Sequence, residues 1–293
     1  MKTSKAYKVM AASMLALAGL SANAQLAHYY YAGSGSILND QVGTANGALE
    51  TGNGTSLSGG ALVTPQNTGA GLSGGVSTGG MYLTGAADAG ITGGFTIFDW
   101  CLPSSSGSSA NTIFSFSDGT PSNMLLATPS DNNGAQPGEY PAHAYSGVAG
   151  SYQDLWNQNV YNGSGGLWLN TGVNLSLVGL TYNGTTLSLY IDGAFQQSAA
   201  VSGLNLSTLT DIGVAGGSPW ATSDTGIGGT TYAFGIFGEA LTSSQMSSLY
   251  GAGDNASASA IDAAIAPVPE PGTLALYGIG SFALLFMRQR FKR

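Results

Sequence analysis

Carboxyl groups are the side chains of this chain best suited to acid–base chemistry, and their spacing does not favour catalysis. The four glutamates, Glu50, Glu139, Glu239 and Glu270, are far apart, and no Glu-x-Asp or Asp-x-Glu pair occurs. Glycoside hydrolysis needs two carboxyl groups flanking the scissile bond, and acids two residues apart on a strand would share one face. Only a long-range pair, such as Glu139 with Asp154, stays open.

The histidines offer little more. His28 and His143 are the only imidazoles, "PAHAYSG" carries no signature of a third catalytic group, and two histidines are a poor set of zinc ligands. No glycine-rich phosphate loop with a following lysine occurs. We therefore predict that the protein is not an enzyme, with a diverged glycoside hydrolase as the less favoured alternative.

Aromatic and amide side chains alternate in "EYPAHAYSGVAGSYQDLWNQNVYNGSGGLWLN". Aromatic faces stack on the C–H surfaces of sugars while amides bind hydroxyl groups, so the mixture suits neutral glycans. The alternative is a long loop whose aromatic side chains pack on one another and cover a sheet. The predicted ligand-binding residues are Tyr140, Tyr145, Tyr152, Asp154, Trp156, Asn157, Asn159 and Trp168, with Trp220 of "GGSPW" as a further one.

Positive charge is confined to the two ends of the chain. All seven Lys and Arg residues lie before Val9 or after Met287, and the net charge is −8. Phosphate binding depends on Lys and Arg, which excludes nucleic acid as a partner and argues against an anionic membrane surface. Side-chain salt bridges within the body can form only through His28 or His143. The single cysteine, Cys101, cannot make an internal disulfide and is predicted to be a small buried apolar residue.

The N-terminal end has the three parts of a secretory signal peptide. Three lysines precede an apolar run from Val9 to Leu20, and Ala22-Asn23-Ala24 then provides an A-x-A cleavage site. We expect cleavage after Ala24, which leaves Gln25 as the first residue. The export machinery is accordingly a predicted partner.

The C-terminal end combines Pro269-Glu270-Pro271 with an apolar run from Leu274 to Met287 and a basic terminus. Fourteen helical residues reach about 21 Å, short of the ~30 Å hydrocarbon core. These parts, in this order, resemble a PEP-CTERM sorting tail. The resemblance implies recognition by an exosortase-like protease, transient insertion of the short helix in the inner membrane, and delivery to the cell surface or extracellular matrix. An ordinary single-pass anchor is the alternative.

Between these ends, short apolar-alternating runs separated by Gly, Asn and Asp indicate an all-β sandwich or barrel. Asn183-Gly184 and Asp192-Gly193 are two-residue hairpin turns, and they predict a three-stranded meander from Leu177 to Val201. The other predicted strands are Gly80 to Thr84, Phe95 to Leu102, Thr112 to Ser117, Met124 to Thr128, Asp211 to Val214 and Tyr232 to Phe237. One short helix is expected after the capping box Thr242 to Gln245.

"MYLTG", "FTIFDWCLP", "NTIFSFSDG" and "LVGLTYNGTTLSLYIDG", followed by "YAFGIFGEALTSSQMSSLY", occur in the order of the strands and closing helix of a laminin-G-like (concanavalin A-like lectin/glucanase) domain. The resemblance implies a two-sheet antiparallel jelly-roll sandwich that binds carbohydrate or protein, often with Ca²⁺. "ILNDQVGTANGAL" resembles the opening segment of the family, which makes Asp40 a candidate metal ligand. Tyr232-Ala233 stands where the family often has an acidic pair, and one carboxylate is a poor Ca²⁺ site. No cofactor is therefore certain, and Ca²⁺ stays open.

These patterns predict a signal helix at 1–24, a laminin-G-like sandwich at 25–253, an Ala/Ser-rich linker at 254–267 and a sorting tail at 268–293. The predicted function is that of an exported, non-enzymatic surface or matrix protein whose lectin-like module binds exopolysaccharide or a surface protein. A self-associating structural matrix or coat component is the alternative.

Overall fold

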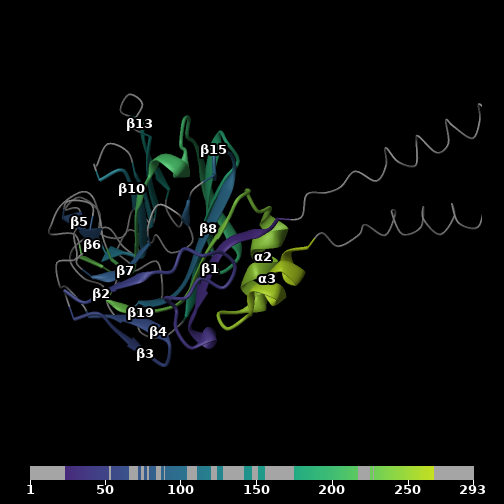
Figure 1. The fold of residues 1–293 in the computed structure, drawn as a ribbon. Helices are drawn as coiled ribbons and strands as arrows, with labels where there is room; N and C mark the ends of the chain where they lie inside the picture. Colours follow the sequence, from purple (N-terminus) through teal and green to yellow (C-terminus); the bar gives the residue numbers. More distant parts are fainter. Residues whose placement is uncertain are drawn as a thin grey trace, which may run out of the picture. The chain divides into compact units, whose positions relative to one another are not determined.

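The computed structural model describes residues 24–266 except for 53, 66–71, 74–75, 78, 84–86, 89, 104–110, 120–123, 128–141, 147–150, 156–174, 217–224 and 227. The predicted signal helix and sorting tail lie outside these residues. The described part forms two antiparallel sheets packed face to face, with helices beside one of them (Figure 1). This arrangement confirms the predicted all-β sandwich.

Sheet A has eight strands in the order β16-β15-β14-β8-β19-β4-β3, with β1 also paired to β19. Its strands are β1 (Leu26–Tyr31), β3 (Ser56–Ser58), β4 (Ala61–Thr64), β8 (Phe95–Pro103), β14 (Ser176–Tyr182), β15 (Thr186–Ile191), β16 (Ala194–Ala200) and β19 (Gly229–Phe237).

Sheet B has seven strands in the order β13-β12-β11-β10-β17-β7-β2. Its strands are β2 (Ala48–Glu50), β7 (Gly80–Leu83), β10 (Phe114–Ser117), β11 (Met124–Ala127), β12 (Ala142–Ser146), β13 (Ser151–Leu155) and β17 (Asp211–Val214). Two short pairs accompany the sheets, β5 (Leu72–Ser73) with β6 (Val76–Ser77), and β9 (Asn111–Thr112) with β18 (Thr225–Gly226). Among the described connections are two 3-10 turns, η1 (Ala32–Ser34) and η3 (Leu206–Thr208).

The main hydrophobic core fills the space between the sheets. Alternate residues of each strand point into it, including Ile97 and Leu180 from sheet A and Phe116 and Ile212 from sheet B, each 0% exposed. Cys101 belongs to this core and has a free thiol, as its apolar surroundings in the sequence predicted. Burial raises the pKa of this thiol well above its ordinary value, so it stays neutral.

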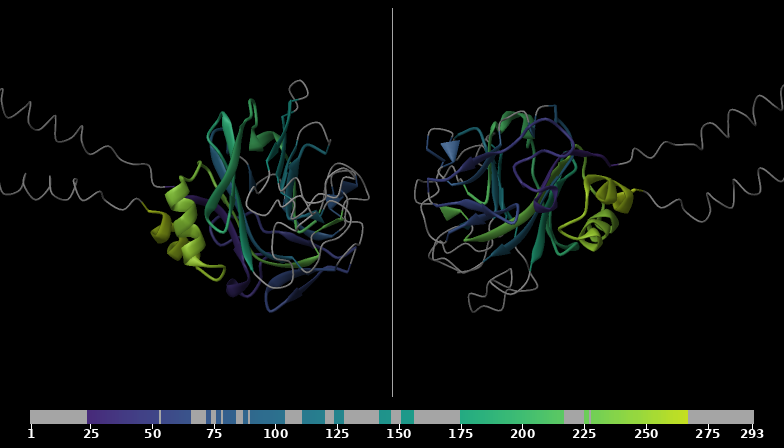
Figure 2. Two further views of the ribbon diagram at one scale, coloured as in Figure 1. Left: turned by 180° about the vertical axis from the view of Figure 1, so that it is seen from behind. Right: turned by 60° about the horizontal axis from the view of Figure 1, so that its bottom comes forward.

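A second cluster covers the other face of sheet A. Helices α2 (Ser243–Ala252) and α3 (Ala258–Ile265) pack there, and Figure 2 shows both helices on the side of sheet A away from sheet B. Because β8 is covered on both faces, Phe98 and Trp100 are buried on one face just as Ile97 is on the other. The predicted capping box is present, with Thr242 and Gln245 exchanging hydrogen bonds at the start of α2.

The segment predicted as a linker, 254–267, differs from that expectation. Eight of its residues form α3, whose Ile261 and Ile265 are 0% and 1% exposed in the second cluster. An Ala-rich composition suits a helix as well as a linker. The two isoleucines are four residues apart, so they lie on the same face of the helix. The domain therefore extends through Ile265 rather than ending near Gly253.

Candidate functional site

The face of sheet B that points away from the core carries polar and aromatic positions, and we call it the outer face of sheet B. Phe114 and Phe116 of β10 enter the core, so Ser115 and Ser117 between them point the other way. Antiparallel partners share a face. The register therefore continues across the sheet as two neighbouring rows of paired backbone positions, in which side chains are described for β2, β7, β10, β11 and β17.

The first row runs across five strands. Its members are Tyr152, Tyr145, Met124, Ser117 and Asp211. The second row crosses the sheet from β13 to β2. Its members are Asp154, His143, Leu126, Ser115, Gly213, Tyr82 and Ala48.

Three of the predicted ligand-binding residues fall in these rows. Tyr145 of β12 pairs with Tyr152 of β13, and Asp154 pairs with His143, so hairpin partners align positions that are seven to eleven apart in the chain. The other predicted residues lie outside the described part of the chain. They are Tyr140, Trp156, Asn157, Asn159, Trp168 and Trp220.

Tyr82 and Asp211 are members of the rows that sequence reasoning missed. The Tyr82 hydroxyl donates to Asp211 Oδ1 at 3.4 Å. The residue directly opposite Tyr82 is Gly213, which has no side chain to separate the two groups. Burial, and then the neighbouring Asp211 carboxylate, raise the pKa of Tyr82. Burial also raises the pKa of Asp211, although the Tyr82 hydrogen bond opposes this. The alternation in "MYLTG" and "DIGV" was the available signal.

The outer face is covered at its centre and more open toward β7. Met124 and Ser117 are 0% exposed and Leu126 is 2% exposed, whereas Tyr82 and Asp211 are half-buried. Ser117 Oγ accepts a hydrogen bond from the Gly119 amide at 3.2 Å. A ligand approaching the described part of this face would therefore meet the Tyr82 phenol and the Asp211 carboxyl group. These groups can bind sugar hydroxyls as donors and acceptors.

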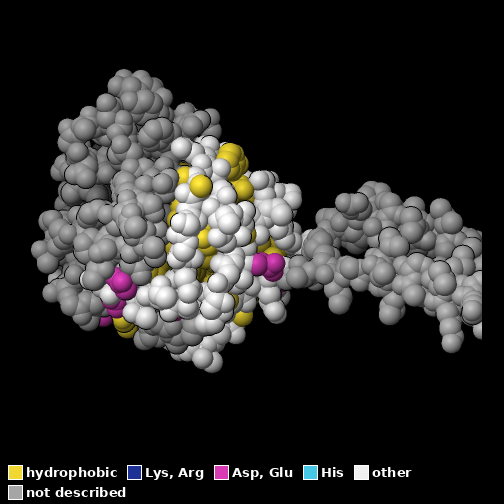
Figure 3. All heavy atoms as spheres, turned by 90° about the horizontal axis from the view of Figure 1, so that it is seen from above, with side chains coloured by type: hydrophobic (Ala, Val, Ile, Leu, Met, Phe, Trp, Pro, Cys, Tyr) yellow, Lys and Arg dark blue, Asp and Glu magenta, His cyan; other side chains and the backbone are white. Residues whose placement is uncertain are grey.

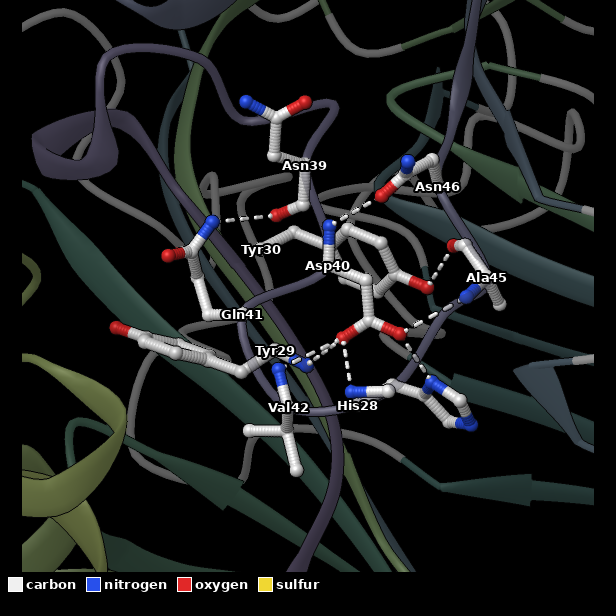
Figure 4. Close-up of polar contacts among 10 residues, drawn as sticks. His28, Tyr29, Tyr30, Asn39, Asp40, Gln41, Val42, Ala45 and Asn46 are labelled. Atoms are coloured by element: carbon white, nitrogen blue, oxygen red, sulfur yellow. Dashed lines mark hydrogen bonds and ion pairs between the residues drawn. The ribbon is translucent and has the colours of Figure 1, made fainter.

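The candidate metal ligand Asp40 has a different role. Its Oδ2 lies 2.6 Å from His28 Nδ1 and accepts the Ala45 amide at 3.1 Å, while Oδ1 accepts the Tyr29, Val42 and Gly43 amides at 3.0–3.2 Å. Figure 4 shows the carboxylate surrounded by these donors. An ionised carboxylate only accepts, so His28 Nδ1 carries the donated proton.

This hydrogen-bond network stabilises the Asp40 carboxylate itself rather than a bound cation. The Asp40 side chain is 0% exposed. Burial would raise its pKa, but the hydrogen bonds from His28 and the backbone amides outweigh burial and hold the pKa below its ordinary value. Gly43 is required because a Cβ there would come within 2.5 Å of Asp40 Oδ2. Both oxygens face N–H donors, which repel a cation placed among them.

Asp99 is a second unusual acid, and it lies in the core between the sheets. It occupies the middle of β8 opposite Val178 and Phe234, is 0% exposed, and neither of its oxygens has a hydrogen-bond partner among the described residues. The Thr231 and Thr64 hydroxyls are also buried and unpaired there. Burial raises the pKa of Asp99 well above its ordinary value, so the group is a neutral acid in the fold.

Within the described ranges, no three Asp, Glu, His or Cys side chains gather as a metal site requires. None of the helices in that same part of the chain is both long and apolar enough to cross a membrane. The short apolar segment predicted at 274–287 lies beyond it. Toward β7, carboxyl groups do come near one another: in addition to burial, the Asp118 carboxylate raises the pKa of Asp211, and Glu50 acts on the neighbouring Tyr82 hydroxyl.

The two-sheet sandwich has the fold of concanavalin A-like domains. Domain 4 of AbnA, a GH43 extracellular arabinanase from Geobacillus stearothermophilus, superposes with a TM-score of 0.53 at 18% identity over 77% of this chain and 98% of the domain. The Trypanosoma rangeli sialidase superposes with a TM-score of 0.50 at 14% identity over 78% of this chain and 33% of the sialidase. At these identities the likeness concerns the fold.

The C-terminal residues match a known sequence motif. Residues 267–290 match the PEP-CTERM protein-sorting motif, which includes Pro269, Glu270 and Pro271. The motif implies export, processing by an exosortase and sorting to the cell surface. No curated protein matches the chain in sequence.

Proposed function

We propose that this protein is a non-enzymatic surface or matrix component whose sandwich binds neutral polysaccharide through the outer face of sheet B. The observation that carries the proposal is the combination of a PEP-CTERM motif with a concanavalin A-like sandwich in one chain. A sandwich of the same fold, domain 4 of the arabinanase, was solved in complex with arabinotriose. The fold is therefore able to carry a neutral oligosaccharide.

The charge of the described body supports a neutral rather than an anionic glycan. Residues 24–266 contain no Lys or Arg, and Figure 3 shows acidic but no basic side chains among the described residues of the face in view. An anionic polysaccharide would meet repulsion from these carboxylates without a compensating cation. Hydroxyl groups of a neutral sugar can instead bond to Tyr82 and Asp211.

The placing of acids in the sequence supports binding without hydrolysis. Retaining and inverting glycosidases hold their two carboxyl groups about 5–9.5 Å apart. No Glu-x-Asp or Asp-x-Glu pair occurs in the sequence, so no strand presents two such carboxyl groups next to each other on one face. Reducing-sugar release from the host polysaccharide would overturn the non-enzymatic part of this proposal.

Binding can be tested with the exported protein on a glycan array and by polysaccharide pull-down. We expect retention on neutral glycans, with at least a fivefold loss for Tyr145→Ala and for Asp211→Asn. Tyr250→Ala is the matched control, because Tyr250 is 42% exposed and lies on α2, beside the opposite sheet. Retention that is absent, or that falls only with Tyr250→Ala, contradicts the proposed surface.

Sedimentation of the same samples addresses the structural alternative. A matrix or coat component should self-associate as its concentration rises, whereas a glycan-binding module should stay monomeric without ligand. Finding concentration-dependent oligomers and no glycan retention would replace the proposed function with the structural one.

A further inference from the structure

The first strand of the domain begins against its last helix. The Leu26 amide donates to Asp262 Oδ1 of α3 at 3.5 Å, and the Tyr29 hydroxyl donates to the Ala256 carbonyl at 2.9 Å. Ala24 and Ile265 belong to the same hydrophobic cluster. The residue that follows the predicted signal cleavage site and the helix that precedes the sorting motif are therefore neighbours.

Acidic groups gather at this corner without a permanent cation. Asp262 is half-buried on α3, and Asp254 lies in the turn before it, close enough to affect the Tyr29 hydroxyl. The described body has no Lys or Arg, and the pair between the His28 and Asp40 side chains lies elsewhere, with His28 further along β1. Any positive charge that stabilises this corner must come from another source.

We infer that N-terminal processing supplies that charge: cleavage between Ala24 and Gln25 creates an α-ammonium group that pairs with Asp262 and fastens α3 to β1. Hydrolysis adds water across the peptide bond, so the hydroxyl oxygen joins the Ala24 carbonyl carbon and the Gln25 nitrogen gains the protons. A neutral amide nitrogen of the precursor thereby becomes a cation at neutral pH. The inference depends on the cleavage site but not on glycan binding.

The geometry places the new charge within reach of the carboxylate. Adjacent residues of an extended chain are about 3.5 Å apart, so the Gln25 nitrogen lies within roughly 7 Å of Asp262 Oδ1, inside a Debye length of ~8 Å at physiological salt. Gln25 is exposed, and as the first residue it can rotate toward Asp262 without disturbing the Leu26 hydrogen bond. Residues 1–24, including the buried Ala24, are lost in the same step.

The pair would couple the two ends of the processed chain. Asp262 lies in α3, which ends at Ile265, and the sorting motif begins at residue 267. The charge made at the first cleavage site therefore stabilises the helix from which the second processing signal follows. Processing in this order presents the exosortase with a motif attached to a fixed helix.

The absence of lysine from the body permits a direct test on the exported full chain. After N-terminal processing, Lys292 is the only remaining lysine, so in a Lys292→Arg background the α-amine is the only amine that an acetylating reagent can modify. We expect acetylation to lower the melting temperature by about 1–4 °C, the shift of one solvent-accessible ion pair in a domain of this size. In Asp262→Asn the same acetylation should have no effect.

Controls and contrary outcomes are distinct. Glu239→Gln, which removes a half-buried acid that lies at the end of sheet A, should retain the full acetylation effect. An equal loss in wild type and Asp262→Asn, or no loss in either, overturns the pairing. Mass spectrometry that finds a first residue other than Gln25, or Gln25 cyclised with loss of ammonia, overturns it as well, because the ammonium group is then missing. If Asp262→Asn does not fold, Asp262→Glu provides the second variant and should keep part of the acetylation effect.

Discussion

Buried acids give individual residues of this domain an unusual influence on stability. Burial raises the pKa of Asp88 from 3.8 to about 7, and burial also raises the pKa of Asp99 well above its ordinary value. A raised pKa in the fold means that the native state holds protons that the unfolded chain releases. These residues stabilise the fold below pH ~4, and that contribution is lost as the pH rises through the folded pKa.

We therefore expect the free energy of unfolding to fall as the pH is raised from about 4 to 7. Asp88→Asn should flatten this slope and raise the free energy of unfolding at pH 7 by roughly 1–3 kcal/mol, because the amide cannot ionise in this buried position. Asp99→Asn should act in the same direction. Urea denaturation at several pH values measures both, with Glu239→Gln as the control. A slope unchanged in both variants would mean that neither acid is protonated in the fold.

Asp40 acts in the opposite direction because its pKa is lowered. Its contribution is present above the ordinary pKa of about 3.9 and is lost as the pH falls through the lower folded value. Asp40→Ala should reduce the free energy of unfolding at pH 7 by about 2–4 kcal/mol, since it leaves buried donors unpaired. Glu50→Ala is the control in the same urea titration. A loss below ~1 kcal/mol would show that the donors find other partners.

At the scale of elements, glycines in two successive hairpin turns have different tasks. Gly184 and Gly193 both have positive φ, 95° and 74°. A Cβ at Gly184 would meet nothing within 4 Å, whereas one at Gly193 would lie 2.8 Å from Tyr250 Cβ and 3.0 Å from the Met246 carbonyl of α2. The first turn needs glycine for its backbone alone, and the second also needs it for contact with a helix.

Gly184→Ala should cost about 1–2 kcal/mol of unfolding free energy, the penalty for a side chain in the left-handed region. Gly193→Ala should cost at least twice as much, because α2 must also move away from the hairpin. Urea denaturation of the two variants, monitored by circular dichroism, makes the comparison. Equal losses would show that the packing of α2 tolerates the added methyl group.

Hairpins and the capped helix could be predicted because their signals are local. Asn183-Gly184 and Asp192-Gly193 fix their turns within two residues, and β14, β15 and β16 follow within one residue of the predicted ends. The start of β1 and helix α3 gave weaker local signals, since each depends on packing against the other across more than two hundred residues. Asp99 could not be located because both faces of β8 are buried, which removes the alternation that would have marked its side.

The candidate site was predictable only in part for a related reason. The sequence indicated Tyr145 and Tyr152 because they lie in a stretch rich in aromatic residues, and the strand register pairs these two positions. Tyr82 and Asp211 come from strands 129 residues apart, so only the sheet order brings them together. A role for Asp40 was evident, but its partners are amides of its own turn and His28, which a search for ligands in the sequence does not reveal.

At the scale of the whole molecule, sorting should depend on the C-terminal motif and not on the sandwich. Replacing both Pro269 and Pro271 with Ala removes the two ring-restricted positions of the matched segment. We expect the variant to fold but to accumulate unprocessed in the membrane fraction. Immunoblotting of cell fractions measures this, with Pro267→Ala, at the first residue of the matched segment, as the control. Normal release of the double variant would separate sorting from these prolines.

The closeness of Ala24 and Ile265 in one cluster has a mechanical consequence. A pull on the chain beyond Ile265 enters the domain through α3, which two isoleucines and a few polar contacts hold in place, and only afterwards reaches a strand. Such a helix peels turn by turn under load, while the interlocked sheets resist shear. Tension from flow or from a moving matrix would thus unfold α3 first and leave the sandwich folded. The helix could then refold against the intact sheet.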